Sequence, residues 1–317
     1  MAKVFVGKDG LRAGWSALIF VIASAALLIA VKALFDKHTG LRSDEFRLSD
    51  FAVREIILAG GSLLLTLIMS KIEQRPFKIY GFDGPRPLLT LFIGAVWGVV
   101  CVSLLIVVLR LFGLLTFTSL ALHGPDIVRY GLEWGFVFFL AGLFEEVLFR
   151  GFILYTLTRG LAQIYGRRLD DGLSRQLGFW TASIILGSIF FAIHTSHPGD
   201  GPIGLFAAFA ASLAFSVSIW RTGSLWWIIG FHAAWDWSQS FLYGVGDSGI
   251  FVDHRLTTSY PAGSPLLSGG LTGPEGSLFV LPILLLCSLI AAFTLRGGGY
   301  ERKLPKLRDG SQSPQNP

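Results

Sequence analysis

Long apolar segments recur along nearly the whole of the 317-residue chain and constrain its fold more than any other feature. A helix needs about 20 mainly apolar residues to cross a bilayer. Eight segments approach or exceed this length: Ala13–Leu34, Ile56–Ile72, Leu88–Leu115, Ile127–Leu157, Phe179–Thr195, Ile203–Trp220, Leu225–Tyr243 and Leu278–Leu295. In lipid a helix satisfies its own backbone hydrogen bonds. The sequence therefore predicts an all-α, polytopic membrane protein of about eight transmembrane helices.

The composition leaves little room for a separate soluble domain. Only 15% of the residues are charged, against about 25% in average soluble domains. We therefore expect a single helical membrane domain over residues 1–296. The basic tail 297–317, which ends in Ser-Gln-Ser-Pro-Gln-Asn-Pro, is expected to be disordered. The net charge of +5 does not indicate a nucleic-acid partner, because the basic residues lie at helix ends.

The distribution of lysine and arginine predicts the orientation of the chain. Basic residues accumulate at the N-terminus, in alternate loops and in the C-terminal tail, and such residues favour the cytoplasmic side. We expect both termini to be cytoplasmic, in the plasma (inner) membrane of a bacterium. The first apolar segment lacks a convincing cleavage site, so it is expected to remain as a membrane helix. The last outer loop, Gly244–Ser277, is rich in Gly, Pro and Ser, which is typical of a lid, a binding loop or disorder.

Two adjacent acids, Glu145 and Glu146, lie inside one of the apolar segments, and Arg150 follows four residues after the second acid. Ionisable groups within a membrane helix are costly and usually functional. Residues four apart share a helix face, so Glu146 and Arg150 are expected to pair. Glu145 points about 100° away and is left to meet another helix.

Two histidines occur in later apolar segments, each with a companion on the same helix face. Phe190 precedes His194 by four residues, and Asp236 follows His232 by four residues. A carboxylate beside an imidazole can activate a water as general base, and a second imidazole can stabilise an oxyanion. The same groups can also ligate zinc. From the predicted spans, Glu145 and His194 differ in depth by ~10 Å, so a tilt is needed to bring them together.

The three motifs Glu-Glu-x-x-x-Arg, Phe-x-x-x-His and His-x-x-x-Asp, in this order on successive helices, resemble the CPBP family of intramembrane proteases. This family includes type II CAAX prenyl endopeptidases, bacteriocin-processing proteases and Abi proteins. The resemblance implies a CPBP-type catalytic core at about residues 127–243. It also implies a role for each matching residue: Glu145 as the catalytic carboxylate, His194 as its helper in activating water, His232 and Asp236 on the oxyanion side, and Glu146, Arg150 and Phe190 as support.

The sequence departs from the family pattern at Asp236, where many members carry Asn. An ionised Asp cannot donate a hydrogen bond to an oxyanion, so Asp236 would be protonated, orient His232 or bind a metal. The resemblance leaves open whether the enzyme is of the glutamate type or a metalloprotease. We expect no required metal; a divalent ion such as zinc would be held by Glu145, His194 and His232.

The predicted function is hydrolysis of a peptide bond in a membrane-associated substrate, either a prenylated protein or another small peptide or protein. The expected partners are the lipid bilayer and this substrate. One alternative is a non-catalytic scaffold or immunity protein with the same fold. A proton-coupled transporter is another, because carboxylates and histidines in membrane helices also form proton relays. The absence of visible inverted repeats disfavours the transporter.

Overall fold

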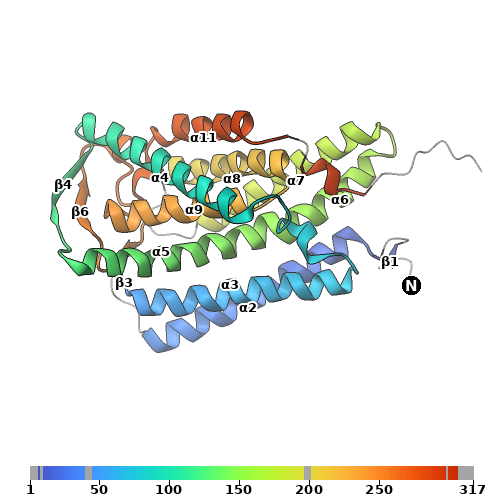
Figure 1. Cartoon of the computed structure of the whole chain (residues 1–317), viewed down its shortest axis with the longest axis horizontal. Coiled ribbons are helices and arrows are strands. Elements are labelled where there is room, and N and C mark those ends of the chain that lie inside the picture. Colours follow the sequence, from blue (N-terminus) through green and yellow to red (C-terminus); the bar gives the residue numbers. More distant parts are fainter. Residues whose placement is uncertain (1–5, 8–9, 40–44, 196–200, 298, 306–317) are drawn as a thin grey trace, which may run out of the picture.

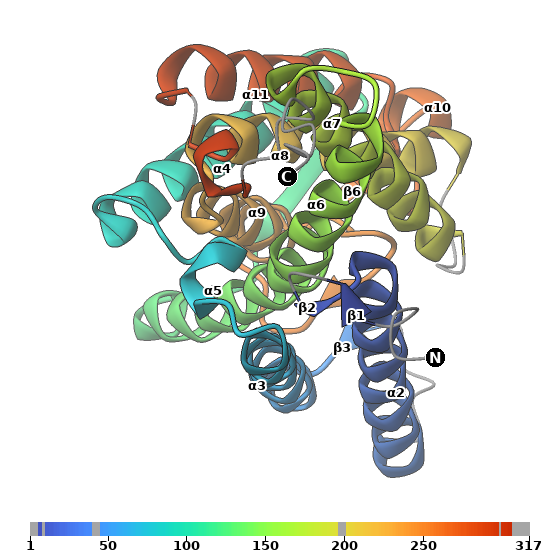
Figure 2. The same ribbon diagram turned by 90° about the vertical axis from the view of Figure 1, so that its right-hand side faces the viewer.

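The computed structural model describes residues 6–7, 10–39, 45–195, 201–297 and 299–305. The elements, in chain order, are β1 (Val6–Gly7), β2 (Gly10–Leu11), α2 (Ala13–Thr39), β3 (Glu45–Phe46), α3 (Leu48–Ile72), η1 (Phe77–Tyr80), α4 (Pro87–Leu111), β4 (Leu115–Leu120), α5 (Pro125–Glu146), η2 (Val147–Ile153), α6 (Leu154–Tyr165), α7 (Asp171–His194), α8 (Pro202–Thr222), α9 (Trp226–Trp237), η3 (Ser238–Leu242), β5 (Phe251–Val252), β6 (Thr257–Pro261), α10 (Pro265–Ser268), η4 (Pro274–Gly276), α11 (Val280–Thr294) and η5 (Glu301–Lys303). Helix α5 runs through the middle of the molecule, with α2 and α3 on one side and α4, α8, α9 and α11 on the other (Figure 1). The view turned by 90° shows the same separation of α2 and α3 from the larger group (Figure 2).

The all-α, polytopic membrane fold predicted from the sequence is confirmed. Within the described residues, five helices are long and apolar enough to cross a membrane: Ala13–Phe35, Leu48–Ile72, Pro87–Leu111, Asp171–His194 and Pro202–Thr222. Helix α11 is apolar but has only 15 residues. The predicted count of eight spans is not confirmed, because the other apolar segments are shorter or form composite helices that carry charged residues.

Two of these composite helices change their winding next to the acidic and histidine motifs. Helix α5 ends at Glu146 and continues without a break through the π-helix η2 into α6. Helix α9 ends at Trp237 and continues into the π-helix η3. Short π segments within α-helices often mark functional sites, because the extra residue in the turn changes the direction of the side chains.

Helix α9 lies close to both α4 and α5 because glycines line the two contacts. A Cβ atom at Gly94 or Gly98 of α4 would lie 2.0 Å or 2.3 Å from a carbonyl oxygen of α9. A Cβ atom at Gly142 of α5 would lie 3.1 Å from a backbone nitrogen of α9. Small residues at helix interfaces allow backbones to approach closely in membranes. This packing fixes α9, which carries His232 and Asp236, against the end of α5, which carries Glu145 and Glu146.

The loop predicted from Gly244 to Ser277 is an ordered part of the fold. Its strand β6 pairs antiparallel with β4, and its strand β5 pairs parallel with β3. The loop also bonds to the end of the preceding helix, since the Leu256 amide donates to the Phe241 carbonyl and the Thr257 hydroxyl to the Leu242 carbonyl. These bonds hold the loop against the end of α9 and η3.

The disorder predicted for residues 297–317 does not extend to residues 299–305. The Tyr300 ring is buried against Phe179, with 4.6 Å between ring centroids, and its hydroxyl donates to the Thr158 hydroxyl. Arg175 of α7 donates to the carbonyls of Glu301, Leu304 and Pro305. Packing of one aromatic side chain therefore orders the start of the tail; residues 306–317 lie outside the described residues.

The glycine contact between α4 and α9 is expected to be essential for stability. Substituting Gly98→Leu places a side chain where the α9 carbonyl lies, and overpacking of this kind costs about 1–3 kcal/mol or more. Thermal unfolding in detergent should show a lower Tm for Gly98→Leu. Gly60→Leu is the matched control, because a Cβ atom at Gly60 of α3 meets nothing within 4 Å. Equal Tm values for the two variants would contradict the close α4–α9 contact.

Candidate active site

The two adjacent acids at the end of α5 lie in different environments. The side chain of Glu146 is fully buried, whereas 34% of the Glu145 side chain is exposed. This agrees with the division expected from helix geometry, in which the two carboxylates point about 100° apart. Glu146 is therefore suited to hold other residues, and Glu145 is suited to meet water or substrate.

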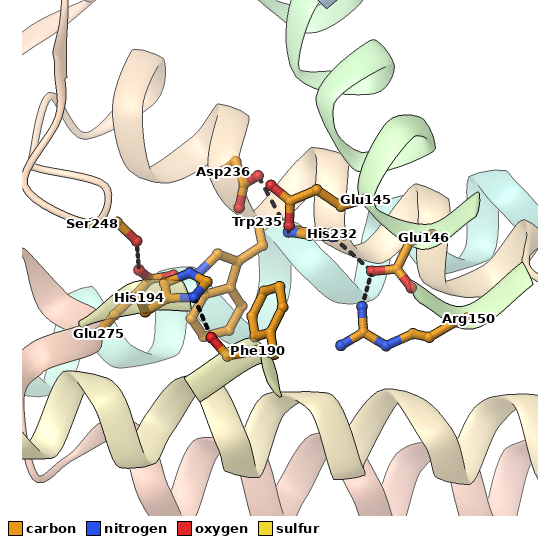
Figure 3. A network of polar contacts seen from close by, with 10 residues as sticks. All are labelled: Glu145, Glu146, Arg150, Phe190, His194, His232, Trp235, Asp236, Ser248 and Glu275. Atoms are coloured by element: carbon orange, nitrogen blue, oxygen red, sulfur yellow. Dashed lines mark hydrogen bonds and ion pairs between the residues drawn. The ribbon is translucent and has the colours of Figure 1, made fainter. Parts of the chain in front are cut away.

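Glu146 pairs with Arg150 as predicted, and it also contacts His232, which the sequence did not indicate. Its Oε1 atom lies 2.7 Å from Arg150 Nη1 and 2.8 Å from His232 Nδ1 (Figure 3). Its Oε2 atom is buried and has no hydrogen-bond partner among the described residues. Arg150 is itself 3% exposed, and a charge buried to this extent is retained only when it is paired. Glu146 therefore joins η2 to α9 through one carboxylate oxygen.

His232 lies among three carboxylates, with its two ring nitrogens facing different partners. Nδ1 faces Glu146, while Nε2 lies 3.6 Å from Asp236 Oδ2 and 3.9 Å from Glu145 Oε2 (Figure 3). The bond at Nδ1 fixes the orientation of the ring, as a carboxylate does for the imidazole in catalytic triads. Nε2 is consequently directed toward the two acids on the more exposed side.

Phe190 and His194 of α7 complete the predicted set, but His194 lies at the edge of the group. The Phe190 ring stands 5.3 Å from the Arg150 guanidinium. His194 follows one helical turn later, with its Nδ1 2.8 Å from the Phe190 carbonyl oxygen and its ring 4.3 Å from the Phe190 ring. In Figure 3 His194 lies toward the Glu275 end of the site. One turn corresponds to about 5.4 Å along the axis of α7.

Two acids that were not predicted as site residues lie beside Asp236. Carboxylate oxygens of Asp236, Asp247 and Glu275 are within 4.8 Å of one another. Burial raises the pKa of Asp247 well above its usual range, and the neighbouring charges of Asp236 and Glu275 raise it further. Both loop residues stand in Gly244–Ser277, where neither helical periodicity nor a motif marks them.

The structure gathers a different set of metal-type ligands from the one predicted. Among the described residues, the group at ligand spacing is Asp236, Asp247 and Glu275 rather than Glu145, His194 and His232. A site made only of carboxylate oxygens suits hard ions such as Mg²⁺ or Ca²⁺, whereas zinc favours sites that include nitrogen or sulfur. Glu145, His194 and His232 do not form such a group among the described residues.

Together these features define a class of protein: a polytopic membrane protein with a carboxylate–histidine site between its helices. Residues 127–238 match the family model for type II CAAX prenyl endopeptidase, Rce1-like. This match supports, at the level of the family, a CAAX-type intramembrane endopeptidase, and it agrees with the resemblance to CPBP proteases indicated by the motifs. No curated protein and no solved structure matches the chain. All seven site residues predicted from the sequence lie within the matched segment, and Asp247 and Glu275 lie beyond it.

The buried pair is expected to matter far more for stability than an exposed pair on the same helix. Arg150→Met leaves the Glu146 charge buried with only His232 beside it, and breaking such a pair costs about 3–5 kcal/mol. Denaturant unfolding in detergent should show this loss and its partial recovery in the double variant Glu146→Gln/Arg150→Met. The control is Arg129→Met, which breaks the exposed Arg129–Glu133 pair, also four residues apart. If both arginine variants unfold alike, burial is not what makes the Arg150 pair important.

Proposed function

We propose that the chain is an intramembrane endopeptidase that hydrolyses a peptide bond of a membrane-associated substrate. The observation that carries this proposal is the partly exposed Glu145 carboxylate beside Nε2 of His232, whose ring is held from behind by the buried Glu146–Arg150 pair. This arrangement lies within an Rce1-like domain. It combines one group that can accept a proton with one imidazole of fixed orientation.

In the proposed reaction Glu145 accepts a proton from a water molecule as the water oxygen attacks the substrate carbonyl carbon. The carbonyl oxygen becomes an oxyanion. His232 stabilises it in the doubly protonated imidazolium form, donating a hydrogen bond from Nε2 to the oxyanion while Nδ1 donates to Glu146. The carbon–nitrogen bond then breaks, and the proton held by Glu145 passes to the leaving amine. His194 is proposed to help hold the water, as the resemblance implies.

Asp236 is proposed to assist on the oxyanion side, next to His232. Its carboxyl oxygen lies 3.6 Å from His232 Nε2. An Asn at this position donates with its amide, whereas Asp donates only when protonated. In its ionised form Asp236 would orient His232 and favour the charged imidazole.

The substrate class proposed first is a prenylated protein or peptide ending in a CAAX sequence, because the matched family is named for that activity. A farnesylated, internally quenched CAAX peptide and the same peptide without the lipid distinguish prenyl-dependent from general cleavage. Substrate trapping in membranes with Glu145→Gln, compared with wild type, identifies the natural substrate independently of this choice.

The catalytic assignment predicts a large and selective loss of cleavage. Glu145→Gln and His232→Ala are expected to reduce kcat at least about 10²-fold, the lower range for loss of a general base or an oxyanion donor. His194→Ala should also reduce kcat. Glu133→Gln is the matched control, since this acid lies on the same helix but is exposed and paired with Arg129. Full activity of Glu145→Gln would refute the mechanism; absence of proteolysis in every form would favour a non-catalytic binding protein.

We propose a glutamate-type mechanism without a required metal, because His232 lies among the carboxylates of Glu145, Glu146 and Asp236 and its Nδ1 is engaged by Glu146. Cleavage of the reporter peptide should persist after dialysis against EDTA, and metal analysis of the active protein should find much less than one ion per chain. Loss of activity with EDTA that zinc restores would instead establish a metalloprotease.

A further inference from the structure

The loop after η3 is folded so that two of its acids face the end of α9. Its backbone crosses itself at glycines: a Cβ atom at Gly273 would lie 1.9 Å from the Gly246 carbonyl oxygen, and one at Gly269 would lie 1.8 Å from the Gly273 carbonyl oxygen. Gly269 and Gly273 also have positive φ angles of 85° and 100°, which favour glycine. This crossing places Asp247, one residue after Gly246, beside Glu275.

Glu275 contacts helix α9 through its side chain. Its Oε1 accepts a hydrogen bond of 3.0 Å from the indole N–H of Trp235, and its Oε2 accepts one of 3.4 Å from the Ser248 hydroxyl. Figure 3 shows Glu275 and Ser248 at the opposite end of the site from Arg150. With both oxygens engaged, the carboxylate is held in one position next to Asp236.

Trp235 belongs to the helical turn that carries the proposed oxyanion groups. It is three residues after His232 and immediately before Asp236, and it is 5% exposed. The regular α-helix ends two residues later, where the π-helix η3 begins. The winding therefore changes directly after this turn, and such π segments are frequent at functional sites. A side-chain anchor at Trp235 fixes the orientation of the last α turn before the change.

We propose that Glu275 is a positioning residue of the active site, which acts through its hydrogen bond to Trp235 to hold His232 and Asp236 in their reactive orientation. This inference rests on the proposed function. It extends the site beyond the Rce1-like match to the loop at 244–277. The effect concerns the chemical step, because Glu275 holds the helix that bears the reacting groups.

The test compares Glu275→Ala, Glu275→Gln, Trp235→Phe and the double variant Glu275→Ala/Trp235→Phe in cleavage of the farnesylated reporter peptide. Glu275→Ala should lower kcat about tenfold with KM within about twofold, since small misplacements of reacting groups are costly. Glu275→Gln keeps an oxygen for the indole N–H and should recover most of this loss. The kcat of the double variant should fall no further than that of Glu275→Ala alone, because both substitutions remove the same hydrogen bond.

Asp253→Ala is the matched control within the same loop. Asp253 accepts a hydrogen bond from the Leu48 amide, at the start of α3. Its substitution by Ala should therefore leave kcat unchanged. A kcat of Glu275→Ala within twofold of wild type, or a double variant whose losses multiply, would overturn the inference. If Glu145→Gln is inactive while Glu275→Ala is fully active, only the positioning role fails. If Glu145→Gln cleaves like wild type, the proposed mechanism fails.

A second readout needs no turnover. In protein labelled with ¹⁵N-tryptophan, the Trp235 indole N–H signal is assigned by its absence in Trp235→Phe. That signal should shift upfield in Glu275→Ala and stay near its wild-type position in Glu275→Gln. An unchanged signal in Glu275→Ala would show that Glu275 does not hold Trp235 and would overturn the inference even without a known substrate.

Discussion

The buried contact of Glu146 with both Arg150 and His232 is the interaction on which the site depends. A charged carboxylate within a membrane protein is stable only where opposite charge and hydrogen-bond donors surround it. Arg150 supplies the charge from the next turn of the same helical path, and His232 supplies a donor from α9. Arg150 and His232 thereby offset the charge of Glu146 at a single oxygen atom. The contact also joins two residues that are 86 positions apart in the chain. The orientation of the His232 ring follows from this bond.

The helix packing makes that contact geometrically attainable. His232 reaches Glu146 only because α9 lies directly against α5, and α9 in turn lies against α4 at two glycines separated by one helical turn. With larger residues at those glycines the helices would stand apart by the size of a side chain. The apolar contact between α4 and α9 and the polar contact between Glu146 and His232 therefore support each other. The loop bonds at Trp235 and Ser240 hold the far end of the same helix.

Much of the site was predictable from sequence because its residues obey helical spacing. The Glu146–Arg150 pair, the separate direction of Glu145 and the shared face of His232 and Asp236 all follow from the four-residue rule, and the contacts agree with it. Spacing does not determine which face of one helix meets another, so the Glu146–His232 contact was not predicted. Asp247 and Glu275 depend on a backbone crossing at glycines, which leaves no periodic signal. The predicted span count is not confirmed, because charged residues and π segments interrupt helices that read as continuous apolar runs. Packing of Tyr300 orders residues 299–305, at the start of a tail whose composition indicated disorder.

The exposed fraction of the polar side chains differs across the site: the residues that hold the site together are buried, and the proposed general base is partly exposed. Arg150 and Glu146 are 3% and 0% exposed, His232 and Asp236 are 15% and 14% exposed, and Glu145 is 34% exposed. A hydrolase within a membrane needs water at one point and must exclude it from the ion pairs that hold the site together, because screening weakens such pairs. Glu145 lies on the accessible side of the site, and Glu146, its immediate neighbour, lies on the enclosed side. Since adjacent residues on a helix point about 100° apart, two consecutive glutamates are the shortest sequence that places one carboxylate on each side of this boundary.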